Sequence, residues 1–436
     1  MFNLLNRTSE SHNLLLWSFI ILIMASCFSN YTNYSNFVIY PIWVLWLVSN
    51  VSIDYLPKNE KTFVRVSYTF LFLMLLYQFI GYSTTETGQL LRNINWIMAG
   101  VVAVYVLKHF SGRDLAIIYI IMTISLLTLL LILIRTGRSL IAIESLEKAS
   151  TVASAWYGSL YMLLSGVSLI VFLHVRKFLP RVIALIVLVL SIYLNFYIMQ
   201  RSTNVIFTIA EIILILVFTI KNKPLIIAMT ILVAGFAIFA SYSNYLILFL
   251  DWLSSVSPSE RLSTRFNEIS IALTYEDVTA TRGGSMSARS DLMNISWNTF
   301  TSSYSHILFG AGDHHDFSVI GDHGFFVDTL ARYGIIGGGL MFAYFKKQYQ
   351  IVMSFLNKKK DWALYMQFAI VFVFYVLRNY YGSLSYGLAN LLILFYFPLT
   401  CQIVKNYKNN SKFSITKVSQ VMTHLHILKF NREKML

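Results

Sequence analysis

Apolar residues occur in long runs along almost the whole chain, and short polar segments separate the runs. Twelve runs approach the roughly 20 residues that a transmembrane helix needs. They cover residues 14–32, 36–53, 62–82, 94–108, 114–134, 157–175, 179–199, 203–220, 224–248, 325–345, 361–378 and 383–403. Because the second and fourth runs are short, the range is about 11 to 13 spans. The pattern predicts an all-α polytopic membrane protein with about 12 transmembrane helices.

The composition agrees with a membrane protein. Of 436 residues, 57% are hydrophobic and 12% are charged. Soluble domains carry roughly 25% charged residues, so this chain has too few charges to cover a soluble surface of its size. A cytosolic globular enzyme, a disordered chain and a small disulfide scaffold are therefore excluded. No small-residue cleavage site follows the first run, which is expected to remain as a signal anchor.

The positions of Lys and Arg predict the orientation in the membrane. With the N-terminus inside and the spans alternating, the inner segments hold 23 basic residues and the outer segments hold ten. Leaving out the long segment 251–324 reduces the outer count to six, because long loops do not follow the positive-inside rule. We expect both termini in the cytoplasm and segment 251–324 outside. The net charge of +14 then indicates cytoplasmic lysines and not nucleic-acid binding.

The same pattern divides the chain into four parts. These are an N-terminal membrane bundle of about nine helices (1–250), an extracytoplasmic loop with short helices (251–324), three C-terminal helices (325–403) and a basic cytoplasmic tail (404–436). In the loop, apolar residues at helical spacing predict an amphipathic helix over 262–273. A second helix is expected from about Ser287 to Tyr304.

Arginine dominates the basic residues of the outer segments. Nine of those ten residues are Arg, whereas 17 of the 23 inner residues are Lys. Arg presents a planar fork of donors that holds a phosphate with two hydrogen bonds. Two interpretations stay open: export disfavours Lys on the outer face, or the outer face binds an anionic ligand.

Four of the nine histidines fall within 18 residues of the outer loop: His306, His314, His315 and His323. The run 313–316 contains two Asp and two His, but contiguous residues rarely converge on one ion, and no His-Glu-x-x-His pattern is present. We therefore predict no metal and no cofactor. The alternative is a site for proton transfer and phosphate binding.

His323 is the best single candidate for proton transfer. We expect Asp322 to be the N-cap of the helix that enters the membrane, with His323 opening that helix. A helix N-terminus disfavours the protonated imidazole, which leaves a neutral side chain able to accept a proton. The alternative is that His323 only satisfies a backbone carbonyl at the end of the span.

Few charged residues lie within the apolar runs. Asp328 and Arg332 are spaced i, i+4 in the tenth run and are expected to neutralise each other. Gly334, Gly337, Gly338 and Gly339 would allow close helix packing. Glu211 is alone near the middle of the eighth run, where it is either a proton relay or a protonated, hydrogen-bonded carboxyl.

Several motifs together resemble the O-antigen ligase and polymerase superfamily. They are Ser287-Ala-Arg289, Trp297, Leu308-Phe309-Gly310-Ala-Gly312, Asp322-His323-Gly324-Phe325 and Leu330-Ala-Arg-Tyr-Gly334-Ile-Ile-Gly337, with Met199-Gln200-Arg201-Ser202 as a short outer turn. In that family Ser usually precedes the turn arginine, and here Gln200 takes its place. The compact run from His323 to Gly337 is most like a Wzy-type repeat-unit polymerase.

The resemblance implies a metal-independent, inverting glycosyltransferase of the bacterial cytoplasmic (inner) membrane, with its active site outside. Its substrate would be a polyprenyl-diphosphate-linked oligosaccharide, and a chain-length regulator and a flippase would be candidate partners. The catalytic residues would be His323 and Arg289. Donor and glycan binding would involve Arg201, Arg282, Trp297, His314, His315 and Arg378, and structural support would come from Asp322, Asp328, Arg332, Gly310, Gly312, Gly334 and Gly337. A ligase of finished glycan is the nearest alternative, and a flippase or other transporter is the third.

Overall fold

The computed structural model describes residues 9–28, 41–42, 56–80, 87–143, 146–195, 202–220, 245–257, 260–274, 285–312, 318–321, 324–359, 361–380 and 387–409. These residues contain helices and no β-strand. The helices are α1 (Ser9–Phe28), α3 (Lys58–Phe79), α4 (Thr87–His109), α5 (Gly112–Ile143), α6 (Leu146–His174), α7 (Phe178–Tyr193), α8 (Ser202–Val217), α10 (Tyr245–Val256), α11 (Glu260–Thr274), α12 (Ser285–Thr301), α13 (Tyr304–Phe309), α14 (Phe325–Met353), α15 (Trp362–Tyr380), α16 (Gly387–Leu391), the π-turn η4 (Leu392–Tyr396) and α17 (Phe397–Asn409). The all-α class is confirmed.

Most of the expected apolar runs are helices. Three helical stretches of the described chain are long and apolar enough to cross a membrane, namely Lys58–Phe79, Gly112–Thr136 and Leu388–Lys405. Seven further apolar helices are shorter. The runs 36–53 and 224–248 lie outside the described residues, apart from 41–42 and 245–248, and so does the tail beyond 409. The count of about 12 spans therefore stays a prediction.

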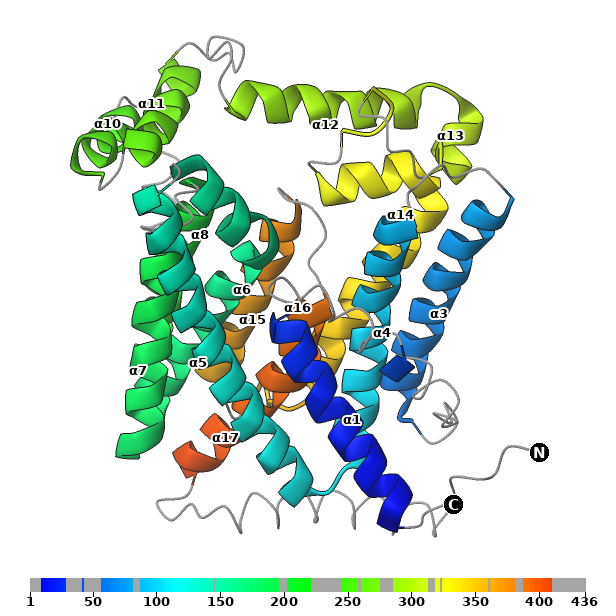
Figure 1. The fold of residues 1–436 in the computed structure, drawn as a ribbon, viewed down its shortest axis with the longest axis vertical. Helices are drawn as coiled ribbons and strands as arrows, with labels where there is room; N and C mark the ends of the chain where they lie inside the picture. Colours follow the sequence, from blue (N-terminus) through cyan, green and yellow to red (C-terminus); the bar gives the residue numbers. More distant parts are fainter. Residues whose placement is uncertain are drawn as a thin grey trace.

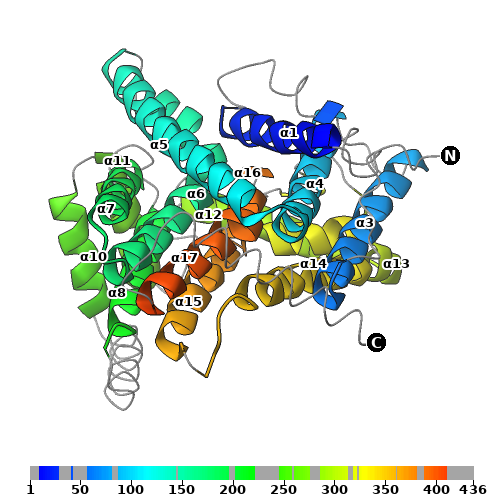
Figure 2. The same ribbon diagram turned by 90° about the horizontal axis from the view of Figure 1, so that it is seen from below.

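Long helices run side by side through the molecule (Figures 1 and 2). Several of them have exposed apolar side chains. On α5, Ile117, Ile120, Ile124 and Leu131 follow one helical face and are all exposed. On α7, Leu185 and Val189 are exposed one turn apart. Because contiguous apolar surface of this kind is unusual in water, it fits contact with lipid.

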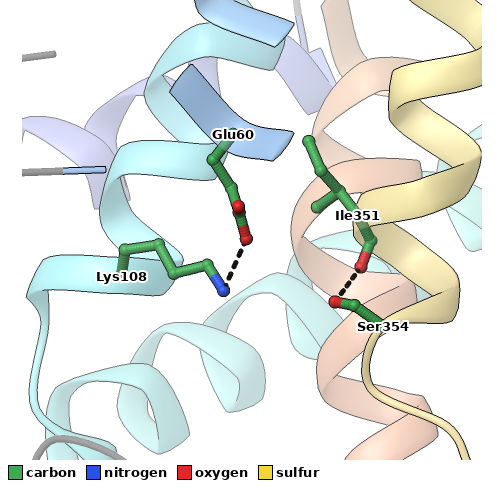
Figure 3. Close-up of polar contacts among 4 residues, drawn as sticks. All are labelled: Glu60, Lys108, Ile351 and Ser354. Atoms are coloured by element: carbon green, nitrogen blue, oxygen red, sulfur yellow. Dashed lines mark hydrogen bonds and ion pairs between the residues drawn. The ribbon is translucent and has the colours of Figure 1, made fainter. Parts of the chain in front are cut away.

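One end of the bundle is fixed by an ion pair between buried Glu60 and half-buried Lys108 (Figure 3). Lys108 Nζ near the end of α4 lies 2.7 Å from Glu60 Oε1 at the start of α3. The same Nζ lies 5.3 Å from the ring centroid of Phe355, which follows α14. Ser354 Oγ donates to the carbonyl of Ile351 at this end of α14. The start of α3 and the ends of α4 and α14 therefore meet at one end of the bundle.

The other end carries a layer of short helices. Figure 1 shows α12 lying across the bundle, with α13 at its end and the first part of α14 beneath it. We call α12, α13, residues 318–321 and residues 324–333 the cap layer. The helix expected from about Ser287 to Tyr304 is α12, which ends at Thr301. A further short helix, α13, follows it, and Ser303 is the N-cap that accepts from His306 N–H. The amphipathic helix expected over 262–273 is confirmed as α11.

A kink divides α14 into a part in the cap layer and a part in the bundle. Gly334 has φ 61° and ψ −162°, which is a conformation open almost only to glycine. The expected single span 325–345 is therefore wrong. Asp328 and Arg332 lie before the kink, in the cap layer, and the bundle part of α14 begins after Gly334.

A buried polar network sits in the core beside the π-turn. Asn390 Nδ2 donates to the carbonyl of Trp96 and to Tyr344 Oη, and Gln348 Nε2 donates to Asn390 Oδ1 at 2.6 Å. The rings of Trp96 and Tyr344 lie 4.8 Å apart. These contacts join α4, α14 and α16, and they fix the part of α14 that carries the cap layer.

Candidate functional site

The structure describes about half of the residues that the sequence singles out. Arg201, Arg282, His314, His315, Asp322 and His323 lie outside the described residues, and Arg289 lies on α12. Trp297, Asp328, Arg332, Arg378 and the motif glycines are described. The geometry of the cap layer shows how the described segments on either side of residues 313–317 and 322–323 are held.

The start of α14 differs from the expectation. The N-cap is Gly324 and the helix begins at Phe325, so the prediction that Asp322 is the N-cap and that His323 opens the helix is wrong. The physical reason is Asp328, whose Oδ2 accepts from the N–H of Gly324 at 2.8 Å. The carboxylate in the first turn thereby accepts a hydrogen bond from the N–H of the N-cap residue. Its negative charge also interacts favourably with the positive end of the helix dipole.

Ser296 joins α12 to the segment before α14. Its hydroxyl donates to Asp328 Oδ1 at 2.6 Å and accepts from the N–H of Gly321 at 2.9 Å. Ser296 is fully buried, and Asp328 is 1% exposed. The hydroxyl and the carboxylate thus hold both sides of the pair 322–323, which includes His323. The expected ion pair between Asp328 and Arg332 stays a prediction.

Two glycines beside His323 permit close approach to α12. A Cβ at Gly321 would overlap the backbone carbonyl of Leu292, and a Cβ at Gly324 would lie 3.1 Å from Met293 Cγ. Arg289 is one turn before Met293 and two turns before Ser296, so its Cα lies on the α12 face that meets these glycines. The backbone positions on either side of His323 are therefore close to that of Arg289.

The two glycine motifs interlock. The N–H groups of Ala311 and Gly312 donate to the carbonyls of Ala331 (2.7 Å) and Arg332 (3.0 Å). Gly310 and Gly334 both have positive φ, and a Cβ on either would overlap backbone of the other segment. The segments 308–312 and 331–334 are separate in the sequence and form one structural unit.

The prediction that the glycines from 334 to 339 allow close helix packing is correct in part. A Cβ at Gly337 would overlap Tyr333 Cβ, and one at Gly338 would lie 2.6 Å from Leu330 Cδ2, so these two let α14 fold on itself at the kink. Gly339 has nothing within 4 Å of a Cβ. Close packing on another element occurs at Gly334.

Tyr77 fixes the cap layer to the bundle. Its hydroxyl donates to the carbonyl of Phe309 at 2.6 Å, and its ring lies 5.6 Å from that of Tyr333. Phe70 packs on the same Tyr333 ring at 5.9 Å. The end of α3 thus supports both interlocked segments.

Arg378 lies on α15, which packs against α8. The rings of Phe207 and Phe374 lie 5.7 Å apart and fix the antiparallel packing of these helices. Arg378 is one turn beyond Phe374, and Arg201 directly precedes the first residue of α8. Arg378 is therefore at the end of the bundle that carries the cap layer.

The exposed face of the cap layer carries aromatic and imidazole groups. Trp297 is 49% exposed and lies 5.5 Å from the ring of Phe300. Tyr304 is 89% exposed. His306 Nδ1 lies 2.6 Å from Ser302 Oγ. A flat exposed ring beside hydrogen-bonding groups suits stacking on a sugar.

Sequence reasoning missed Ser296 and Tyr77. Ser296 precedes the motif residue Trp297, but serine is common in exposed helices and its neighbours gave no signal of burial. Tyr77 is 232 residues from its partner Phe309, and such a pairing leaves no local pattern.

No cluster of three or more His, Cys, Asp or Glu that could hold a metal ion occurs among the described residues. The run 313–316 lies outside them. No family model and no curated protein matches the chain.

Proposed function

We propose that this chain is a polytopic membrane glycosyltransferase that joins polyprenyl-diphosphate-linked oligosaccharide repeat units into an O-antigen or capsular polysaccharide. It would act on the outer face of a bacterial cytoplasmic membrane. The observation that carries the proposal is the cap layer. The described parts of the segments that resemble the superfamily, 287–297, 308–312, 321 and 324–337, are separate in sequence and lie together there, with backbone contacts that only glycine permits.

The helix directions support the proposed topology. Lys108, Lys58 and Lys61 lie at the end where α3 and α4 meet, and Lys346 and Lys347 are in the last third of α14. Tyr77 and the cap layer mark the opposite end. With about 12 spans, the lysine-rich end would face the cytoplasm and the cap layer would face outward.

The proposed reaction is a direct displacement at the anomeric carbon of the donor. The acceptor sugar hydroxyl loses its proton to the imidazole of His323 while its oxygen bonds to the anomeric carbon. The bond from that carbon to the diphosphate oxygen breaks, and the configuration inverts. Arg289, with Arg201, Arg282 and Arg378, would stabilise the negative charge of the departing polyprenyl diphosphate. His314, His315 and Trp297 would contact the glycan.

The cap geometry explains how His323 would be presented. Its neighbours Gly321 and Gly324 are each held by a hydrogen bond that leads to Ser296 or Asp328. Such fixed flanks suit a general base, because a base must stay within hydrogen-bond reach of the proton that it removes. Asp328 and Ser296 are thus proposed as positioning residues.

Deletion of the protein tests the proposed class. Cell-surface and lipid-linked glycans are compared in the deletion strain and its complemented parent. Single repeat units without longer chains would support the polymerase, whereas accumulated lipid-linked polymer would show a ligase. Repeat units trapped on the inner leaflet would show a flippase and refute a glycosyltransferase.

Arg289 offers a sharper test within the site. Arg289→Ala should abolish polymer, and Arg289→Lys should restore it only in part, because Lys lacks the bidentate fork. Polymer length in the complemented strain is the measurement, and membrane level of the variant is its control. Wild-type chain length in the Ala variant would remove Arg289 from the site.

A further inference from the structure

Fully buried polar residues gather between α6, α7 and α8, away from the cap layer. Ser191 lies on α7, Asn195 follows the end of α7, and Thr208 and Glu211 lie one turn apart on α8. All four are 0% exposed. Asn195 Nδ2 donates to Thr208 Oγ1 at 3.1 Å, which joins the two helices. Figures 1 and 2 show α6, α7 and α8 side by side.

Several oxygens of this cluster have no hydrogen-bond partner among the described residues. They are both carboxyl oxygens of Glu211, Oδ1 of Asn195 and Oγ of Ser191. Buried polar atoms are almost always paired, and an exception calls for an unseen water or ion. Three of these four atoms are carboxyl or amide oxygens, so the missing partner is a donor or a cation.

The space beside Glu211 is made by a glycine. A Cβ at Gly166 of α6 would overlap Glu211 Oε1 and would lie 2.8 Å from Val371 Cγ2 of α15. The carboxyl therefore occupies the position next to Gly166, between α6, α8 and α15. Any side chain at residue 166 would displace it.

None of the charged or titratable groups on the surrounding helices hydrogen-bonds to Glu211. On α6, His174 bonds to Gln367 at the far end of the helix. Arg181 at the start of α7 lies over the Phe172 ring, and Arg378 is near the end of α15. Among the described residues, no cationic side chain hydrogen-bonds to either carboxyl oxygen of Glu211.

We propose that this cluster binds one small monovalent cation, a sodium ion or a proton, on the carboxyl of Glu211. Leaving an ionised carboxylate alone in an apolar interior is costly, and one monovalent charge neutralises it, whereas a divalent ion would leave a net positive charge. For sodium, Asn195 Oδ1 and Ser191 Oγ would supply further oxygens. The bound cation would stabilise the packing of α6, α7 and α8.

Thermal unfolding of the purified full-length protein tests the site. At constant ionic strength, with choline replacing sodium, we expect a rise in Tm on the order of 5 °C at saturating sodium or at falling pH. Sodium dependence would identify sodium as the ligand. A Tm that falls as the pH rises, without sodium dependence, would identify the proton.

Two variants sharpen this test. Glu211→Gln keeps the shape of the loaded carboxyl without its charge and should lose the response. Asp291→Asn, at an exposed carboxylate on α12, should keep it. A response that survives in Glu211→Gln would overturn the proposal, and so would a wild-type Tm that depends on neither sodium nor pH.

A second measurement needs no variant. A hydrophobic carbodiimide modifies a buried carboxyl only in its protonated form, and mass spectrometry locates the modified residue. We expect modification at Glu211 that sodium or rising pH suppresses. Modification unaffected by both would contradict a cation site. Because these readouts do not involve glycan synthesis, the site and the proposed polymerase can fail independently.

Discussion

Asp328 and Glu211 are both buried carboxyls in helices of the same chain, and their surroundings are opposite. Asp328 accepts from the hydroxyl of Ser296 and from the N–H of Gly324, whereas neither oxygen of Glu211 has a partner among the described residues. A carboxyl whose two oxygens both accept hydrogen bonds holds the segments that donate to it in place, since these hydrogen bonds are lost if either segment moves. An unpartnered one leaves its charge to be balanced by a ligand. The cap layer is therefore a fixed frame, whereas Glu211 in the α6–α8 core is the position at which we propose that a cation binds.

Substitution of the glycines should show the largest difference in stability between the two regions. Gly334→Ala places a Cβ on the backbone carbonyl of Leu308 at a φ that alanine avoids, so the interlock with 308–312 should open and polymer should be lost. Gly166→Ala meets the end of a side chain and should cost less stability. Tm and polymer length measure both effects.

Gly339→Ala is the matched control, since its Cβ would have nothing within 4 Å. It should be neutral or slightly stabilising. A Tm for Gly334→Ala that equals that of Gly339→Ala would mean that the interlock does not hold the cap layer.

Substitution of the two carboxyls should show a smaller difference in the free energy of unfolding. Asp328→Asn replaces one acceptor oxygen with an amide nitrogen and leaves a buried donor without an acceptor, which costs about 1–3 kcal/mol. Glu211→Gln removes no acceptor from a protein donor and removes a charge that no described residue balances, so without sodium and at high pH it should be at least as stable as the wild type. Chemical denaturation in detergent measures both. Equal losses in the two variants would remove the distinction between them.

The hydroxyls should show the smallest difference. Tyr77→Phe removes the hydrogen bond to Phe309 and keeps the ring contacts, for a loss of about 1 kcal/mol. Ser191→Ala removes a hydroxyl that has no partner, and it should cost nothing when no cation is bound. The Tm of both variants is measured without sodium. A larger fall in Tm for Ser191→Ala than for Tyr77→Phe would contradict the account.

The sequence predicted the regular parts of this fold and missed the irregular ones. Apolar runs located helices such as α5 and α7, because the length of an apolar run is a local property of the sequence and does not depend on which segments pack against it. The kink at Gly334 and the start of α14 at Phe325 depend on contacts with Leu308 and Asp328 that form only in the folded chain. Local capping rules therefore placed the helix start two residues too early.

The candidate site was predictable where a motif carries it. The glycines at 310 and 334 were identified from their pattern, and the structure gives their physical reason in the overlap that any side chain would cause. Glu211 was identified as a lone charge in an apolar run, but its lack of partners and the space at Gly166 required the structure. Ser296 had no signal in the sequence at all.

The central claim, that the cap layer carries a glycosyltransferase site with His323 as its base, is tested most directly with purified protein and a polyprenyl-diphosphate-linked oligosaccharide. We predict that the wild type forms polymer in the presence of a strong chelator. His323→Ala should lose about 10²–10⁴-fold in rate while it still binds the donor. Wild-type activity lost on chelation and restored by a divalent cation, or a His323→Ala loss well below tenfold, would contradict the account.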